Sequence, residues 1–239
     1  MSKKSRRDSN NQEYNSREKK RFHQKDILQI QPKTDTQKLL FHHWKQGQKH
    51  LYLHGAAGTG KTFCALFLAL NDLLNKDSFY DKIVIVRSIV PCRDIGFLPG
   101  DLTEKIEIYE RPYKDICDQL FSWQNSYENL KKLNYIEFES TSFLRGITLD
   151  NAIIIVDEFQ NMTFSELDTI ITRVGLNSKI VFCGDKAQTD LSKTNGWSQF
   201  SSIISKMKND FEQISFTSDD IIRNQLVKKY IILRDSYIN

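Results

Sequence analysis

The segment Gly55-Ala56-Ala57-Gly58-Thr59-Gly60-Lys61-Thr62 fits the spacing GxxxxGK[ST] at every fixed position. Glycines let backbone N–H groups turn inward around a phosphate, and the N-terminus of a following helix adds partial positive charge. In such loops the lysine reaches the β- and γ-phosphates, and the threonine hydroxyl ligates Mg²⁺. The context fits as well, because an apolar strand-like stretch precedes the loop and an apolar helical stretch, residues 62–74, follows it. We therefore predict a triphosphate-binding loop with Lys61 as a catalytic residue and Thr62 as a metal ligand.

A second acidic motif follows a buried strand. Residues 153–156 are Ile-Ile-Ile-Val, and Asp157 and Glu158 come directly after them. We expect Asp157 to hold the Mg²⁺ through water and Glu158 to orient the attacking water as a general base. Lys61 and Asp157 are far enough apart in the sequence for other strands to lie between the strand before Lys61 and the strand that ends at Asp157. That spacing favours NTPases with a glutamate on the second motif over kinase-like P-loop enzymes.

A third polar motif, Gly184-Asp185-Lys186-Ala187-Gln188, also follows an apolar stretch. The carboxyl ends of parallel strands meet at one edge of a sheet, where ligands bind. We therefore expect Gln188 to face the γ-phosphate, the alternative being an ordinary turn residue.

The elements that position these motifs alternate between strands and helices. Six short β-branched stretches predict strands at residues 50–54, 82–87, 135–139, 152–157, 179–184 and 212–216. Two of them, 83–86 and 153–156, are apolar at every position, as in strands whose two faces are both covered by helices. The pattern predicts an α/β fold with a mostly parallel, doubly wound sheet. A capping box, Thr163-x-x-Glu166, predicts a helix that ends at Gly175.

Composition is consistent with one such fold. The 239 residues are 39% hydrophobic and 27% charged, which suffices for one sizeable core. No apolar run approaches the ~20 residues of a membrane helix, so an integral membrane protein is excluded, and the charged N-terminus is not a secretory signal. The four cysteines, at positions 64, 92, 117 and 183, form no CxxC pattern and indicate a reducing, cytoplasmic compartment.

Positive charge is concentrated at the N-terminus. Residues 1–25 contain nine lysines and arginines and three acidic residues, so they carry +6, and the rest of the +4 chain carries −2. We expect a disordered basic arm over 1–25 and a single folded domain over 26–239. The arm is expected either to contact nucleic-acid phosphates or only to solubilise the protein.

The order of the motifs resembles the PhoH family of P-loop ATPases, which are related to the core of superfamily-one helicases. The resemblance covers about residues 35–230, and the segments GFLPGD at 96–101 and RGIT at 145–148 are specific to that family. The other matching segments are residues 55–62, 157–161, 172–175, 184–188 and 217–223.

This resemblance implies a RecA-like fold, ATP hydrolysis, association with single-stranded RNA and a homo-oligomeric, hexameric ring. It places Gln37 where a helicase-type glutamine reads adenine, and Arg223 at the helicase-like arginine motif. The short length resembles versions carried by bacteriophages. The chain departs from the family pattern at Phe159, where a small residue is usual, at Arg87-Ser88 in place of Arg-Pro, and at Asn224-Gln225 in place of His-Pro.

A hydrolase of this type needs positive charge on the γ-phosphate in the transition state. Arg223 is the first candidate, acting on its own subunit or on a neighbour, and Arg87, Arg145 and Arg173 are the others. Arg145 has a second possible role on the phosphates of a polynucleotide. Phe97 and Leu98 either pack into the core or face a partner.

Two functions from different classes follow. The first is an Mg²⁺-dependent ATPase coupled to RNA handling, and the second is a module whose assembly ATP controls with negligible turnover. A small-molecule kinase is a third, less supported possibility, because Glu158 suits water activation.

Overall fold

The computed structural model describes residues 22–89, 102–141, 144, 146–185 and 196–238. Its strands are β1 (His50–Gly55), β2 (Lys82–Arg87), β3 (Ile136–Ser140), β4 (Ala152–Asp157), β5 (Lys179–Gly184) and β6 (Phe211–Phe216). Its α-helices are α2 (Asp35–Gln46), α3 (Lys61–Leu73), α4 (Leu102–Phe121), α5 (Ser126–Lys132), α6 (Phe164–Ile171), α7 (Trp197–Ile204) and α8 (Gln225–Ile238). Single 3₁₀ turns are η1 (Gln24–Asp26), η3 (Phe159–Asn161) and η4 (Ser218–Asp220).

The six strands form one sheet in the order β3-β2-β4-β5-β1-β6, and every neighbouring pair is parallel. All six predicted strands are confirmed, with bounds that differ by one residue at most. β5 lies between β1, which leads into the phosphate loop, and β4, which ends in Asp157. The expectation that another strand separates these two motifs is therefore correct.

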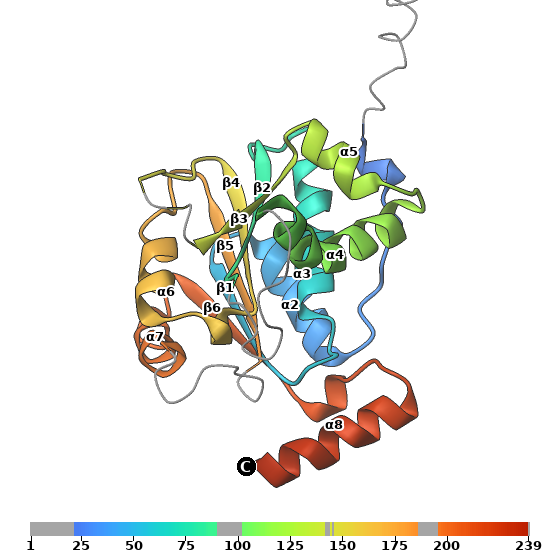
Figure 1. Ribbon diagram of the computed structural model, residues 1–239, viewed down its shortest axis with the longest axis vertical. Helices are drawn as coiled ribbons and strands as arrows, with labels where there is room; N and C mark the ends of the chain where they lie inside the picture. Colours follow the sequence, from blue (N-terminus) through green and yellow to red (C-terminus); the bar gives the residue numbers. More distant parts are fainter. Residues whose placement is uncertain (1–21, 90–101, 142–143, 145, 186–195, 239) are drawn as a thin grey trace, which may run out of the picture.

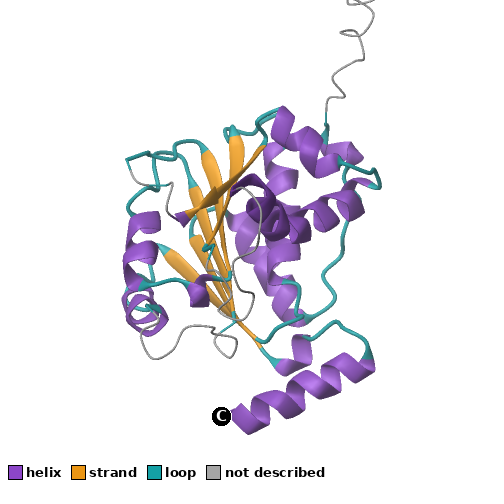
Figure 2. Ribbon diagram, in the orientation of Figure 1, coloured by secondary structure: helices purple, strands orange, loops and turns teal. Residues whose placement is uncertain are grey.

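Helices cover both faces of the sheet, with α2 to α5 on one side and α6 and α7 on the other (Figures 1 and 2). Because side chains alternate along a strand, Ile83 and Ile85 pack under the first layer, whereas Val84 and Val86 pack under the second. This two-sided burial is the physical reason for the continuous apolar stretches in the sequence. The expected α/β architecture of RecA-like P-loop NTPases is thus confirmed.

The predicted boundary of the basic arm is wrong by a few residues. Phe22 is buried, with its ring 4.9 Å from that of Phe121 and 5.3 Å from that of Trp123. η1 follows it at once, and Leu28 N donates to the carbonyl of Leu120. Residues 22–25 therefore belong to the folded domain, because the aromatic side chain of Phe22 packs in the core.

The capping box at Thr163 and Glu166 is confirmed, but the helix that it starts ends earlier than predicted. α6 stops at Ile171 rather than at Gly175. Gly175 instead donates its backbone N–H to the carbonyl of Leu149 at 2.9 Å, and a Cβ on it would lie 2.0 Å from Asp150 Oδ1. Gly175 therefore allows two loops to approach closely, and it does not cap the helix.

α8 lies below the two layers in Figure 1 and packs chiefly against η4. Leu226, Tyr230, Leu233 and Tyr237, which recur at helical spacing, are between 50% and 89% exposed. Among the described residues, no helix combines the length and the hydrophobicity that crossing a lipid bilayer requires.

Candidate nucleotide-binding site

The phosphate loop connects β1 to α3, as the sequence predicts. Gly55 has φ +117°, and a Cβ on it would lie 1.9 Å from the carbonyl oxygen of Phe216, so only glycine lets the two strand ends approach. Ala56 N–H donates to that same oxygen at 3.0 Å. Gly60, with φ +82°, is the left-handed residue from which α3 begins. The loop is thus closed on one side by β6 and on the other by a helix N-terminus.

Lys61 lies inside this loop. Its Nζ donates to the carbonyls of Gly55 at 2.8 Å and Ala56 at 2.7 Å, and its side chain is buried. Burial lowers the pKa of Lys61, while the negative charge of Asp185 acts in the opposite direction. The lysine is therefore held at the loop, where an anionic ligand would favour its charged form.

Thr62 and Asp157 meet at the start of α3 and the end of β4. Thr62 Oγ1 donates to Asp157 Oδ1 at 2.7 Å, and the carboxylate is 5% exposed. Oxygen ligands of this kind suit Mg²⁺, which binds proteins through one or two carboxylates and takes further ligands from nucleotide phosphates. Among the described residues no group of three or more His, Cys, Asp or Glu could hold a metal by itself.

Glu158 adopts the left-handed backbone conformation, with φ +53°. Burial, followed by the charge of Asp157, raises its pKa, and Gln160 Nε2 donates a hydrogen bond to its Oε2. Gln160 in turn accepts a hydrogen bond from Asp185 N–H at 3.0 Å. The two acidic strand ends, on β4 and β5, are thus joined through one amide side chain.

Phe159, the departure from the family pattern, points away from this carboxylate cluster. Its fully buried ring lies 5.0 Å from that of Tyr52 and 5.9 Å from that of Phe182, in the core beneath α6 and α7. Gly184 gives it room, because a Cβ there would be 2.6 Å from the Phe159 ring. The Phe159 ring therefore packs in the core, while Asp157 and Glu158 line the cavity.

Gln37 lies against the other end of the loop, and it is buried. Its Nε2 donates to the Thr59 carbonyl at 2.9 Å, and its Oε1 accepts from Lys33 N–H at 2.8 Å. Gln37 therefore contacts the nucleotide loop, and its role toward adenine stays a prediction. Ile30 and Lys33, from the segment that precedes α2, line the same cavity.

The structure brings two of the four candidate arginines to the cavity, Arg87 and Arg223. Arg223 Cγ would be 3.0 Å from a Cβ on Gly58, and the neighbouring Ile222 N–H donates to the Gly58 carbonyl, so this segment packs directly on the loop of its own chain. Arg173 does not line the cavity. Arg145, Gln188 and the segment 96–101 lie outside the described residues.

One contact that the sequence does not predict comes from α4. Tyr113 is fully buried, and its hydroxyl donates to Asp157 Oδ2 at 2.8 Å. Burial acts to lower the pKa of Arg87, but the neighbouring Tyr113, Asp157 and Glu158 favour its charged form and raise this pKa. No local sequence pattern reveals which carboxylate a tyrosine hydroxyl will meet.

These groups surround a cavity of about 630 Å³ at the carboxyl edge of the sheet. The phosphate loop, Asp157, Glu158, Asp185 and the inner face of α4 form its walls. Lys61 and the backbone amides of the phosphate loop therefore line one side of the cavity, and the carboxylates of Asp157 and Glu158 line the other. This arrangement suits a magnesium-bound triphosphate and a water molecule.

Comparison with known proteins agrees with this geometry. The sequence matches the family described as PhoH-like protein over residues 29–234. It is 36% identical over 190 residues to a PhoH-like protein of Synechocystis sp., an alignment that covers 77% of this chain and 56% of the relative. A PhoH-like protein of Bacillus subtilis is 36% identical over 181 residues, covering 74% and 55% of the two chains.

The fold is similar to that of the large terminase from a thermophilic bacteriophage, solved in complex with ADP. The TM-score is 0.52 at 14% identity, and the match covers 82% of this chain and 49% of the terminase. This chain spans little more than half the length of the curated relatives described above. From the match over residues 29–234 and the identity to these relatives, the chain belongs to the PhoH-like protein family.

Proposed function

We propose that this protein is a Mg²⁺-dependent ATPase that handles single-stranded RNA as a homo-oligomeric, hexameric ring in the cytoplasm. The observation that carries the proposal is the meeting of Lys61, Thr62, Asp157 and Glu158 around one cavity. Family membership supports nucleotide use, and the three cysteines among the described residues, which are free and buried, support a reducing compartment. A bacteriophage origin stays a prediction.

The catalytic roles follow from the chemistry of these groups. Lys61 and the loop N–H groups bind the β- and γ-phosphates, while Thr62 and Asp157 would hold Mg²⁺, which neutralises developing negative charge when bound. Glu158, whose raised pKa favours proton uptake, orients water and accepts its proton. Gln188 is assigned to the γ-phosphate, and Arg223 supplies positive charge in the transition state.

RNA binding rests on the basic N-terminal arm. Residues 1–21 carry eight of the chain's lysines and arginines, and a polynucleotide is the ligand to which such charge is suited. If about four of these cations engage phosphates of single-stranded RNA, the logarithm of affinity should fall with the logarithm of salt at a slope of roughly −3.

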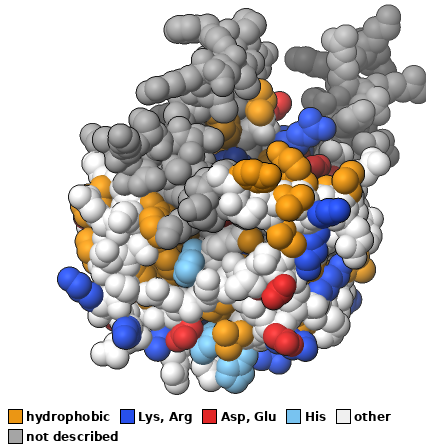
Figure 3. Space-filling view, turned by 90° about the horizontal axis from the view of Figure 1, so that it is seen from below, with side chains coloured by type: hydrophobic (Ala, Val, Ile, Leu, Met, Phe, Trp, Pro, Cys, Tyr) orange, Lys and Arg blue, Asp and Glu red, His pale blue; other side chains and the backbone are white. Residues whose placement is uncertain are grey.

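Self-association is supported by the exposed apolar side chains of α8. Hydrophobic side chains gather on the face seen in Figure 3, the side of the molecule on which α8 lies in Figure 1. Contiguous exposed apolar surface marks interaction sites in soluble proteins. Arg223 closely precedes this helix, so a neighbouring subunit on α8 would lie near the nucleotide.

The alternative function is assembly controlled by ATP with negligible turnover. The departure from the family pattern at Phe159 leaves room for it, but the Phe159 ring packs in the core and not beside Asp157 and Glu158. The test is ATP turnover with and without single-stranded RNA, with the oligomer mass measured in the same buffer. We expect turnover and a multimer; ATP-dependent assembly without turnover would favour the alternative.

A further inference from the structure

A buried tyrosine of α4, beside the residues of that helix that line the cavity, reaches the carboxylate that we propose as a metal ligand. Tyr113 has no exposed surface, and its hydroxyl donates to Asp157 Oδ2 at 2.8 Å. It follows Pro112 within α4, and Pro112 itself lines the nucleotide cavity. Tyr113 thus approaches Asp157 from α4, whereas the phosphate loop approaches it from the start of α3.

Both oxygens of Asp157 have hydrogen-bond donors from different elements. Thr62 donates to Oδ1 from α3 and Tyr113 donates to Oδ2 from α4. Rotation of the carboxylate would break both bonds, each between buried or half-buried groups, where lost hydrogen bonds are costly. Arg87, the last residue of β2, lies close enough for its positive charge to interact with both Tyr113 and Asp157.

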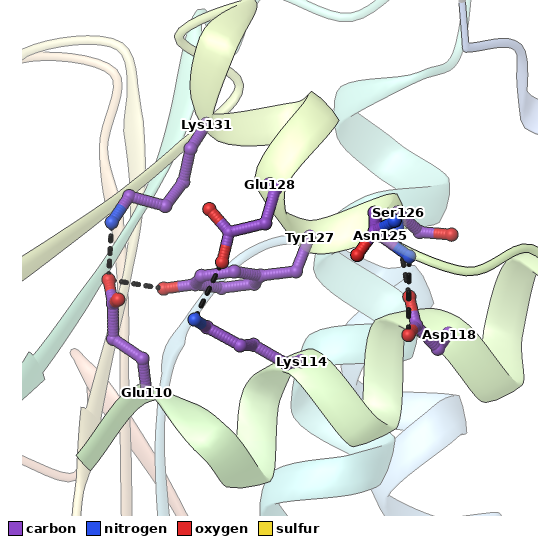
Figure 4. Close-up of polar contacts among 8 residues, drawn as sticks. All are labelled: Glu110, Lys114, Asp118, Asn125, Ser126, Tyr127, Glu128 and Lys131. Atoms are coloured by element: carbon purple, nitrogen blue, oxygen red, sulfur yellow. Dashed lines mark hydrogen bonds and ion pairs between the residues drawn. The ribbon is translucent and has the colours of Figure 1, made fainter. Parts of the chain in front are cut away.

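α4 is itself fixed by polar contacts to α5, which Figure 4 shows. Glu110, one turn before Tyr113, is buried and accepts hydrogen bonds from Tyr127 at 3.0 Å and Lys131 at 2.5 Å. Lys114 pairs with Glu128 at 2.7 Å. Nearer the C-terminal end of α4, the Asp118 carboxylate accepts hydrogen bonds from backbone N–H groups at the start of α5, including that of Ser126 at 2.8 Å. Contacts with α5 therefore fix α4 both before and after Tyr113 along the helix.

We propose that Tyr113 is a positioning residue for the metal site, whose hydroxyl holds the Asp157 carboxylate so that Oδ1, beside Thr62, is presented to Mg²⁺. This inference rests on the proposed function. Metal-ligating carboxylates depend on such hydrogen bonds, and loss of an outer partner typically costs about 10–100-fold in metal affinity or activity. Tyr113 acts only through Asp157, because its hydroxyl is directed at that carboxylate and its side chain does not line the cavity.

The test measures how much magnesium increases the affinity of the protein for nucleotide. A fluorescent, non-hydrolysable ATP analogue is titrated into each variant in excess magnesium and again in EDTA. For Tyr113→Phe, which keeps the buried ring, we expect affinity in magnesium to fall about tenfold or more, with affinity in EDTA unchanged. Tyr113→Leu also lacks the hydroxyl, so it must show the same selective loss.

Tyr52→Phe is the matched control, because it removes one buried phenol hydroxyl on the opposite face of the sheet, away from α4 and from the cavity. It should leave the magnesium gain unchanged. In an Asp157→Asn background, Tyr113→Phe should have no further effect. If magnesium does not increase the nucleotide affinity of the parent, the proposed function fails. If magnesium increases the affinity of the parent and of folded Tyr113→Phe equally, only this inference is wrong.

Discussion

Thr62 and Asp157 are separated by 95 positions in the chain, yet Thr62 Oγ1 donates to Asp157 Oδ1 at 2.7 Å. The contact exists because α3 begins at the carboxyl edge of the sheet, where β4 also ends. It joins the phosphate loop to the acidic motif directly, so the fold already brings together the two oxygens that we propose as Mg²⁺ ligands.

Removing either partner should abolish the gain in ATP affinity from magnesium. We expect Thr62→Ala and Asp157→Asn to bind ATP with similar affinity in magnesium and in EDTA, because the metal loses a protein ligand. Thr36→Ala is a matched control, since Thr36 donates to Asp220 in a similar hydroxyl–carboxylate pair that does not line the cavity. Retention of the full magnesium effect in both site variants would show that the metal binds elsewhere.

Phe159 should matter for stability and not for nucleotide binding. Phe159→Ala removes a fully buried ring between Tyr52 and Phe182, and such truncations cost about 3–5 kcal/mol in the free energy of unfolding. Urea unfolding measures this loss, and ATP binding is measured under conditions where the variant is folded. A stable variant that has lost ATP affinity would contradict the buried position.

Glu166 should make stability depend on pH in the acidic range. Burial acts to raise its pKa, but hydrogen bonds from Thr141, Thr163 and Ser88 outweigh this effect and lower it. A lowered folded pKa stabilises the protein above the unfolded value, about 4.3, and this contribution is lost as pH falls through the folded pKa. Glu166→Gln should therefore melt below the parent at pH 7, with the difference shrinking under acid. A difference that is constant with pH would exclude this origin.

The two parts of the N-terminal segment should separate in deletion experiments. Removing residues 1–21 should leave the melting temperature unchanged but weaken single-stranded RNA binding and flatten its salt dependence, because eight cations are lost. Phe22→Ala should do the reverse, because it removes only a buried ring that packs on Phe121. Unchanged RNA affinity after the deletion would identify the arm as solubilising only.

Local patterns were sufficient for the strands and the phosphate loop. Two-sided burial makes residues 153–156 continuously apolar, and the loop between β1 and α3 needs glycines that no other residue replaces. These signals lie within a few neighbouring positions, so they can be found without knowing what packs where. The position of the two carboxylates at the end of β4 follows from the same reasoning, because parallel strand ends share one edge.

Long-range contacts could not be found in this way. The bond from Tyr113 to Asp157 depends on where α4 crosses the sheet, and the burial of Phe22 depends on a pocket between Phe121 and Trp123. Gly175 shows the opposite error, since a glycine after a helical pattern suggests a cap, whereas here it permits contact with Asp150. Each case is decided by residues far away in the sequence.

Phosphate release from ATP in the presence of magnesium, compared for the parent, Lys61→Ala and Glu158→Gln, tests the central claim most directly. We predict turnover by the parent, loss of both ATP binding and turnover in Lys61→Ala, and retained binding with turnover at least about 100-fold lower in Glu158→Gln. Equal rates of phosphate release in all three proteins would contradict the assignment of this cavity as the site of hydrolysis.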